Sequence, residues 1–137
     1  MKPRKNLLRI LGIVLLLLVA VEGVSADSEL YNGTIQMGDG YQINNYVIDV
    51  VDVFVEADSA SFNVYKKDEI IKEPLISPNG SFSFDFEDDS KVEVKLNSVS
   101  SGTLPVARVS IVLSDYNVKD LHTNQVIEGG HDNANFA

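Results

Sequence analysis

The chain contains no cysteine and no tryptophan among its 137 residues. Without cysteine it can form neither a disulfide nor a cysteine-ligated metal site, and it has no residue for a lipoprotein anchor. Thiol-based catalysis is excluded for the same reason. The fold must therefore be stabilised by its apolar core alone, and a carbohydrate site would lack the tryptophan on which sugars commonly stack.

Basic residues are also few, and several of them are concentrated at the start of the chain. Lys2, Arg4, Lys5 and Arg9 precede an apolar run over residues 10–21. A helix of a dozen residues rises about 18 Å, well short of the roughly 30 Å of a bilayer's hydrocarbon core. Small residues at 24–26 fit a peptidase site before Asp27. The sequence thus predicts a signal-peptide helix over 1–26 and a secreted or cell-surface protein, with an uncleaved membrane anchor as the alternative.

The charge balance of the remaining chain is strongly acidic. The first 26 residues hold four of the 11 Lys and Arg and one of the 20 Asp and Glu, which leaves 7 basic and 19 acidic residues and a net charge of −12 after cleavage. Such a surface repels nucleic acid and anionic lipid. We therefore expect no nucleic-acid partner, and membrane contact only through an uncleaved signal segment. Divalent cations or basic surfaces remain possible partners.

Apolar residues recur with period two over much of the chain, the spacing that places alternate side chains on one face of a strand. Phe82, Phe84 and Phe86 alternate with polar residues, and a similar run over 92–96 follows after the polar stretch 87–90. These two runs predict a hairpin. A second hairpin is predicted over 61–76, with Pro74 interrupting its returning strand because proline lacks a ladder donor.

Two further features of the pattern predict irregular backbone. The apolar phase slips at Val50-Val51, and a strand cannot change its buried face without an extra residue, so we expect a bulge between Asp49 and Asp52. Residues 77–80 (Ser-Pro-Asn-Gly) are a strong turn signal.

About seven short strands, ending with one over 107–115, predict an all-β fold, an immunoglobulin-like antiparallel β-sandwich. We assign 27–117 to this domain and predict that the polar residues 118–137 form a flexible tail.

Three stretches of this domain resemble a known family. They are Met37-Gly38-Asp39-Gly40-Tyr41, the valine and aspartate run 47–53, and the stretch 61–68 that ends in Tyr65-Lys66-Lys67-Asp68. Over residues 30–116 the chain resembles the β-sandwich modules of archaeal S-layer-related surface proteins. That resemblance implies an extracytoplasmic module of a cell-surface layer or complex, without a catalytic centre.

Candidate sites are of three kinds. Asn32-Gly33-Thr34 and Asn79-Gly80-Ser81 are sequons that export would expose to glycosylation, although each Asn-Gly pair also suits a tight turn. Asp85, Glu87, Asp88 and Asp89 surround one predicted turn and could supply oxygen ligands to calcium, or could simply be solvated. Tyr31, Tyr41, Tyr46 and Tyr65 could form a binding face, unless they close the ends of the sandwich.

No catalytic motif is present. The chain has no nucleophile elbow, no His-Glu-x-x-His pair and no phosphate-binding glycine loop, and its two histidines, His122 and His131, lie in the predicted tail. We therefore expect no enzyme activity and no cofactor other than a possible calcium ion. The leading interpretation is a structural or interaction module that contacts other cell-surface proteins or itself. The alternative is an extracellular module that binds glycan or calcium.

Overall fold

The computed structural model describes residues 27–114 and 121–136. Within them the chain forms ten strands and two short 3-10 helices. In chain order these are β1 (Ser28–Gln36), β2 (Gly40–Ile43), β3 (Tyr46–Phe54), β4 (Ser59–Lys66), β5 (Glu69–Lys72), β6 (Leu75–Ile76), β7 (Ser81–Asp85), η1 (Glu87–Asp89), β8 (Lys91–Ser100), β9 (Val106–Ser114), β10 (Asn124–Ile127) and η2 (Gly130–Asn133).

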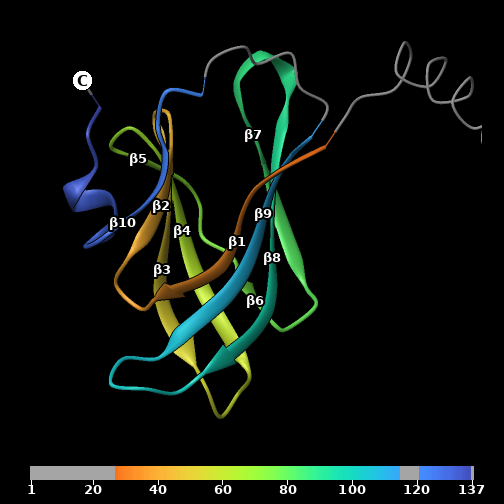
Figure 1. Cartoon of the computed structure of the whole chain (residues 1–137), viewed down its shortest axis with the longest axis vertical. Coiled ribbons are helices and arrows are strands. Elements are labelled where there is room, and N and C mark those ends of the chain that lie inside the picture. The colour runs from red at the N-terminus through yellow and green to blue at the C-terminus, as the bar shows by residue number, and fades with distance from the viewer. Residues whose placement is uncertain (1–26, 115–120, 137) are drawn as a thin grey trace, which may run out of the picture.

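The strands form two antiparallel sheets (Figure 1). One sheet has the order β1-β9-β8-β7, and the other has the order β10-β2-β3-β4-β5, with β6 also pairing β4. The predicted all-β antiparallel class is confirmed. Ten strands form where about seven were predicted, because β1 and β10 lie outside the region of clear alternation and because the returning strand of one hairpin is divided into β5 and β6.

An apolar core lies between the two sheets. Phe62 of β4 lies against Phe82 of β7 with ring centroids 5.2 Å apart, and Tyr46 of β3 stacks on Phe84 at 5.8 Å. Val92, Val94 and Leu96 of β8 are fully buried in the same cluster. The period-two pattern therefore identified the inward faces of both sheets correctly.

The local predictions for the hairpins and the bulge are confirmed. β7 pairs with β8 in the expected hairpin, and β4 pairs with β5 in the other. Pro74 separates β5 from β6. The register of β3 against β4 shifts between Val50 and Asp52, so an extra residue does change the buried face there.

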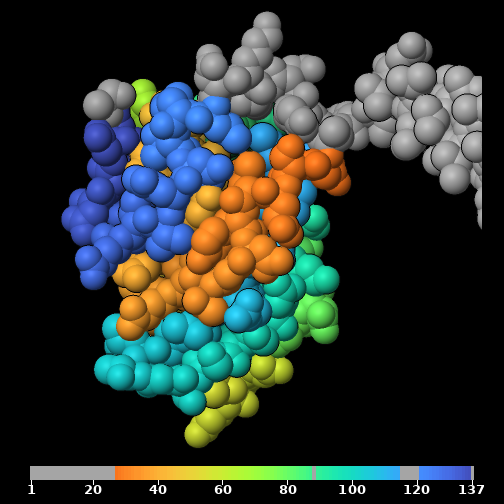
Figure 2. All heavy atoms as spheres, in the orientation of Figure 1, coloured from red at the N-terminus to blue at the C-terminus, as the bar shows by residue number. Residues whose placement is uncertain are grey.

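The prediction of a loose tail is wrong for residues 124–133. β10 pairs with β2 along its whole length, and η2 follows it. In Figure 2 the C-terminal residues (blue) lie against the N-terminal strands (orange). The sequence signal was weak because this segment is held largely through its backbone. Side chains of the turns beside β2 bind it: Asn44 Oδ1 accepts the His122 N–H at 3.0 Å, and Asp39 Oδ1 accepts that of Gly129 at 3.0 Å.

Two predictions fall outside the described residues. These are the signal-peptide helix over 1–26 and the domain boundary between 117 and 118. Across 27–114 and 121–136, no helix is both long and apolar enough to cross a membrane.

Candidate functional site

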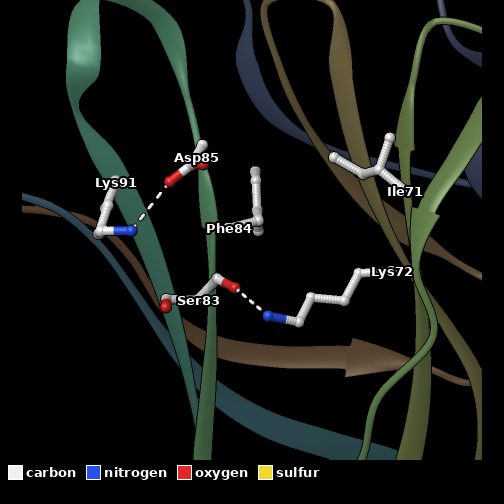
Figure 3. Close-up of a pocket in the computed structure, with 6 residues that line it drawn as sticks. All are labelled: Ile71, Lys72, Ser83, Phe84, Asp85 and Lys91. Carbon is white, nitrogen blue, oxygen red and sulfur yellow. Dashed lines mark hydrogen bonds and ion pairs between the residues drawn. The ribbon is translucent and has the colours of Figure 1, made fainter.

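A cleft opens between the edges of the two sheets on one side of the sandwich. It has a volume of about 410 Å³ and lies between β5 of one sheet and β7 of the other. The core residue Phe84 lines the cleft on the β7 side, and Ile71 and Lys72 line it on the β5 side. Figure 3 shows Lys72 extended from β5 toward β7, where its Nζ donates a hydrogen bond to the Ser83 carbonyl at 2.6 Å.

β7 is an edge strand, and one side of its backbone faces this cleft. In an antiparallel ladder the N–H and C=O of one residue point to the same side. The Leu96 N–H donates to the Gly80 carbonyl and the Phe86 N–H to the Ser90 carbonyl, so the even-numbered residues of β7 face β8. Ser81, Ser83 and Asp85 therefore turn their backbone groups toward the open edge, in keeping with the Lys72 contact.

β5 is the corresponding edge of the other sheet. All four of its residues are exposed, including Ile70 at 42% and Ile71 at 41%. It pairs with β4 on one side only. Two isoleucines on a strand with an unpaired side are a surface that a second polypeptide can cover.

The charges at the cleft differ from those of the chain as a whole. Lys72 and Lys91 line it together with one acid, Asp85, whereas the chain has a net charge of −9. Lys91 Nζ lies 2.9 Å from Asp85 Oδ1. This hydrogen bond, with the charge of Lys91, lowers the pKa of Asp85, and the same contact raises the pKa of Lys91. The pair is solvent-exposed and contributes little to stability.

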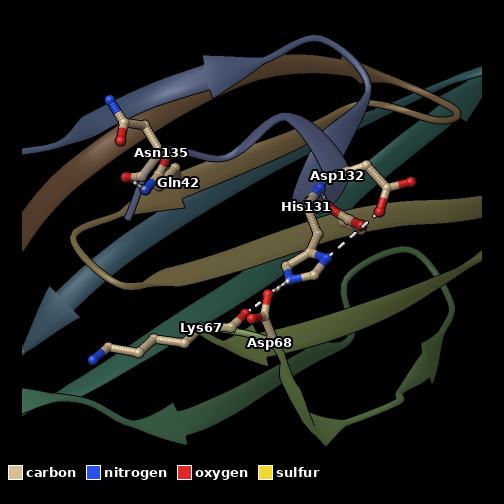
Figure 4. Close-up of polar contacts among 7 residues, drawn as sticks. Gln42, Lys67, Asp68, His131, Asp132 and Asn135 are labelled. Carbon is tan, nitrogen blue, oxygen red and sulfur yellow. Dashed lines mark hydrogen bonds and ion pairs between the residues drawn. The ribbon is translucent and has the colours of Figure 1, made fainter. Parts of the chain in front are cut away.

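A second polar cluster lies on the outer face of the six-stranded sheet, around His131 (Figure 4). The imidazole stacks on Tyr65 with centroids 3.8 Å apart and planes 10° from parallel. Its Nε2 lies 2.8 Å from the Lys67 carbonyl, which can only accept, so Nε2 carries the proton. Asp68 and Asp132 lie 3.4 and 3.8 Å from the two ring nitrogens.

Asp49 of β3 binds the backbone of the C-terminal segment at His131. Its Oδ1 accepts the His131 backbone N–H at 2.8 Å. Burial raises the pKa of this carboxyl to about 6, although the His131 N–H acts in the opposite direction. Gln42 of β2 also binds this segment, because its Nε2 donates a hydrogen bond to the Asn135 carbonyl at 2.9 Å. The cluster holds the C-terminal segment on the sheet, and its polar groups are largely engaged in doing so.

Two of the four acidic residues predicted to bind calcium are bonded to other side chains of the protein. Asp85 is paired with Lys91, and a Glu87 oxygen accepts a hydrogen bond from Asn44 Nδ2 at 3.2 Å. Asp88 and Asp89 continue the 3-10 turn η1. In the part of the chain that the structure describes, no three acidic or histidine side chains are grouped to hold a metal ion.

The four tyrosines do not form one binding face. Tyr41 and Tyr46 are only 2% and 5% exposed, so the prediction that they make external contacts is wrong. Both belong to the apolar core, and the polar ring end of Tyr41 is buried because its hydroxyl is bonded. The Tyr41 hydroxyl donates to the Leu30 carbonyl at 3.1 Å, and burial raises its pKa to about 12. Tyr31 is partly buried against Tyr41, and Tyr65 lies under His131.

Both sequon asparagines are exposed. Asn32 lies on β1, and Asn79 lies in the turn before β7 with a positive φ of 69°. The Gly80 N–H closes this turn on the Ser77 carbonyl at 2.8 Å, as the turn signal predicted. Their accessibility is compatible with glycosylation, which stays a prediction.

No protein-family model matches the chain, and no curated protein matches it significantly. The candidate site therefore depends on geometry. Sequence reasoning missed Ile71, Lys72 and Ser83, since nothing in their spacing showed that two edges of different sheets would meet. The short run Glu-Ile-Ile-Lys beside Pro74 was the available signal, because apolar residues next to a proline favour an edge strand.

Proposed function

We propose that the chain is an exported, non-enzymatic interaction module of a cell surface, with an immunoglobulin-like arrangement of its sheets, that acts by protein–protein contact. The observation that carries the proposal is the open side of the sandwich between β5 and β7. There, exposed isoleucines, outward-facing backbone groups and two lysines are presented together. Edge strands that offer such groups are a recurrent means of peptide and protein recognition.

Two features of the sequence support the exported and surface-associated parts of the proposal. The basic start followed by a short apolar run is typical of a signal peptide. The resemblance of residues 30–116 to modules of archaeal S-layer-related proteins adds a cell-surface setting. The alternative of a glycan- or calcium-binding module has less support, because Tyr41, Tyr46 and Asp85 are already occupied within the fold.

Site-specific photo-crosslinking tests the proposal. A photoreactive amino acid replaces Ile71 in the full chain, expressed in the cells that naturally make it, and a matched probe replaces Leu104. Leu104 is equally exposed, at 43% against 41%, but lies in the loop between β8 and β9. We expect a protein adduct from position 71 in the cell-envelope fraction and none from position 104. Adducts absent at both positions, or equal at both, would contradict the proposal.

A further inference from the structure

Of the two strand edges at the cleft, β7 has the regular register. Its five residues pair with β8 from Ser81 to Asp85 without a shift. The β4–β5 ladder, in contrast, shifts between Val64 and Tyr65 and skips Ile71. A bulge bends its strand and disrupts the ladder, so a further strand pairs best with an edge that has none. β7 is therefore the edge suited to an added strand, and β5 forms the opposite wall of the cleft.

The backbone of β7 can bond such a strand from the cleft side. Ser81, Ser83 and Asp85 turn their N–H and C=O groups toward the open edge. The Ser83 carbonyl already accepts a hydrogen bond from that direction, because Lys72 Nζ donates to it at 2.6 Å. In an antiparallel ladder, an added residue opposite Ser83 would exchange two main-chain hydrogen bonds with it and would displace the Lys72 ammonium.

Alternation determines which side chains of an added strand point into the cleft. Phe82 and Phe84 are buried in the core, so the added residues opposite them also point to the core side of the sheet. Figure 3 shows Ile71 on the Phe84 side of the cleft and Lys72 at Ser83. The added residue opposite Phe84 then meets the exposed Ile71. The added residue opposite Phe82 lies next to Lys72.

The charges of the cleft favour an acidic residue next to Lys72. Asp85 is paired with Lys91 at 2.9 Å, so these two charges offset each other. Lys72 donates instead to a neutral carbonyl, within a chain whose net charge is −9. When an added strand occupies the Ser83 carbonyl, a carboxylate on that strand gives the displaced ammonium an ionised acceptor. An apolar side chain suits the other position, where it covers the exposed Ile71.

We propose that the cleft binds an extended segment of another protein, which pairs antiparallel with β7 and points one apolar and one acidic side chain toward β5. This inference rests on the proposed function and gives the chemistry of the partner at the same site. The cleft volume of about 410 Å³ lies within the usual range of protein ligand sites, about 300 to 1,000 Å³. The bound segment would extend the four-stranded sheet by one strand, a recurrent mode of peptide recognition.

Blocked five-residue peptides test the proposal. The probe acetyl-Thr-Val-Thr-Glu-Thr-amide places valine opposite Phe84 and glutamate opposite Phe82 when its central threonine lies opposite Ser83. One comparison peptide has lysine in place of glutamate. The other carries a methyl group on the central threonine nitrogen, which removes the donor to the Ser83 carbonyl. NMR chemical-shift titration of the full chain, isotope-labelled in cells that express it, gives the dissociation constants and identifies the affected amides.

The three peptides should bind with different affinities. We expect the glutamate peptide to shift the amide signals of Ser81, Ser83 and Asp85 in a saturable way. The lysine peptide should bind about fivefold more weakly, because it brings a like charge to Lys72. The N-methyl peptide should bind about tenfold more weakly, because it lacks the hydrogen bond to the Ser83 carbonyl.

Two pairs of variants assign these contacts to the chain. Lys72→Glu should reverse the preference, so that the lysine peptide binds more tightly than the glutamate peptide. The matched control Lys67→Glu makes the same charge change in the exposed turn before β5 and should keep the preference. Ser83→Pro removes an N–H that faces the open edge rather than β8, so it should abolish binding without loss of a ladder donor. Ser83→Thr keeps the N–H and should bind as the wild type does.

The outcomes distinguish this inference from the function on which it rests. Absence of saturable binding by the glutamate peptide, or equal binding by its N-methyl form, overturns the strand pairing even where Ser83→Pro does not fold. An unchanged preference in Lys72→Glu overturns the acidic specificity. Shifts of the β7 amides that depend on chain concentration without peptide identify a second copy as the occupant and overturn the separate partner. If position 71 still forms an adduct with an envelope protein, the interaction function stands and only the mode of recognition is wrong. If position 71 forms no adduct, the function itself is contradicted.

Discussion

The six-stranded sheet ends in two unlike edges. At one, β10 is the outermost strand and exposes three of its four residues, but side chains of the two turns beside β2 accept backbone N–H groups of the C-terminal segment. We call this the closed edge. At the other, β5 has no strand beyond it and exposes every residue. Polar groups gather at both edges, and around His131 they are largely bonded within the chain. A cluster of titratable residues, such as that around His131, can therefore be structural, while the sparser β5 edge is the one that we propose makes the contact.

The largest expected effect is at the closed edge. A Cβ on Gly40 would lie 2.5 Å from Asp49 Oδ1 and 2.9 Å from the Ile48 carbonyl, with Gly130 Cα at 3.2 Å. Gly40→Ala should therefore lower the free energy of unfolding by about 2 kcal/mol, as overpacking does. Chemical denaturation measures this. Gly102→Ala, in the loop after β8, is the control and should change stability by less than about 0.5 kcal/mol. Equal effects of the two would show that the closed edge is not tightly packed.

Loss of the His131 ring should release the C-terminal segment more selectively. His131→Ala removes both the stack on Tyr65 and the bond to the Lys67 carbonyl, and should cost about 1 kcal/mol. Amide hydrogen exchange should accelerate in β10 and stay unchanged in β8. His131→Phe keeps only the stack on Tyr65, so its stability and its exchange rates in β10 should lie between those of the wild type and of His131→Ala. Unchanged exchange in β10 would mean that η2 does not hold the segment in place.

The buried carboxyl of Asp49 makes the closed edge sensitive to pH. Its pKa is about 6 in the folded chain against 3.8 for the unperturbed group, so the folded state favours the protonated form. The stabilisation from protonation is complete below about pH 3.8 and is lost as the pH rises through 6.

Asp49→Asn keeps an oxygen acceptor for the His131 N–H and removes the charge. The variant should match the wild type near pH 4 and exceed it by about 1 kcal/mol at pH 7, a value reduced for the partial solvent screening of this half-buried group. Thermal unfolding from pH 4 to 7 measures the difference. A pH dependence that persists unchanged in Asp49→Asn would assign it to other groups.

Sequence reasoning succeeded for the features of this fold that are local. Alternation identified the core faces, because burial of Phe62, Phe82 and Phe84 is determined by each strand's own pattern. The bulge near Asp52 followed from a phase slip in the same pattern. Features of this kind can be derived from neighbouring residues alone.

Both edges, in contrast, depend on residues far apart in the chain. Gln42 meets Asn135, and Lys72 meets Ser83, through the path of the chain rather than through a repeating pattern. β10 has three exposed residues of four and a single buried one, so no apolar stripe indicated it. The predicted tyrosine binding face was wrong for a different reason. Alternation places Tyr46 inward, but the prediction of surface contacts was made from residue type alone.

The smallest expected effect on stability is at the open edge, where the effect on association should be clear. Ile71 is 41% exposed, so Ile71→Ser should change the free energy of unfolding by less than about 1 kcal/mol. The same substitution should weaken protein contact at β5 several-fold, because it removes apolar area that only a partner buries. Val126→Ser on β10 is the matched control, since Val126 is also 41% exposed, and it should leave the contact unchanged. Denaturation gives the first value, and the yield of envelope-protein adducts from a photoreactive residue at Ile70 of the same strand gives the second. If Ile71→Ser leaves association intact, or if Val126→Ser weakens it equally, the two edges do not differ in function, and the open side of the sandwich is no more than the place where the sheets end.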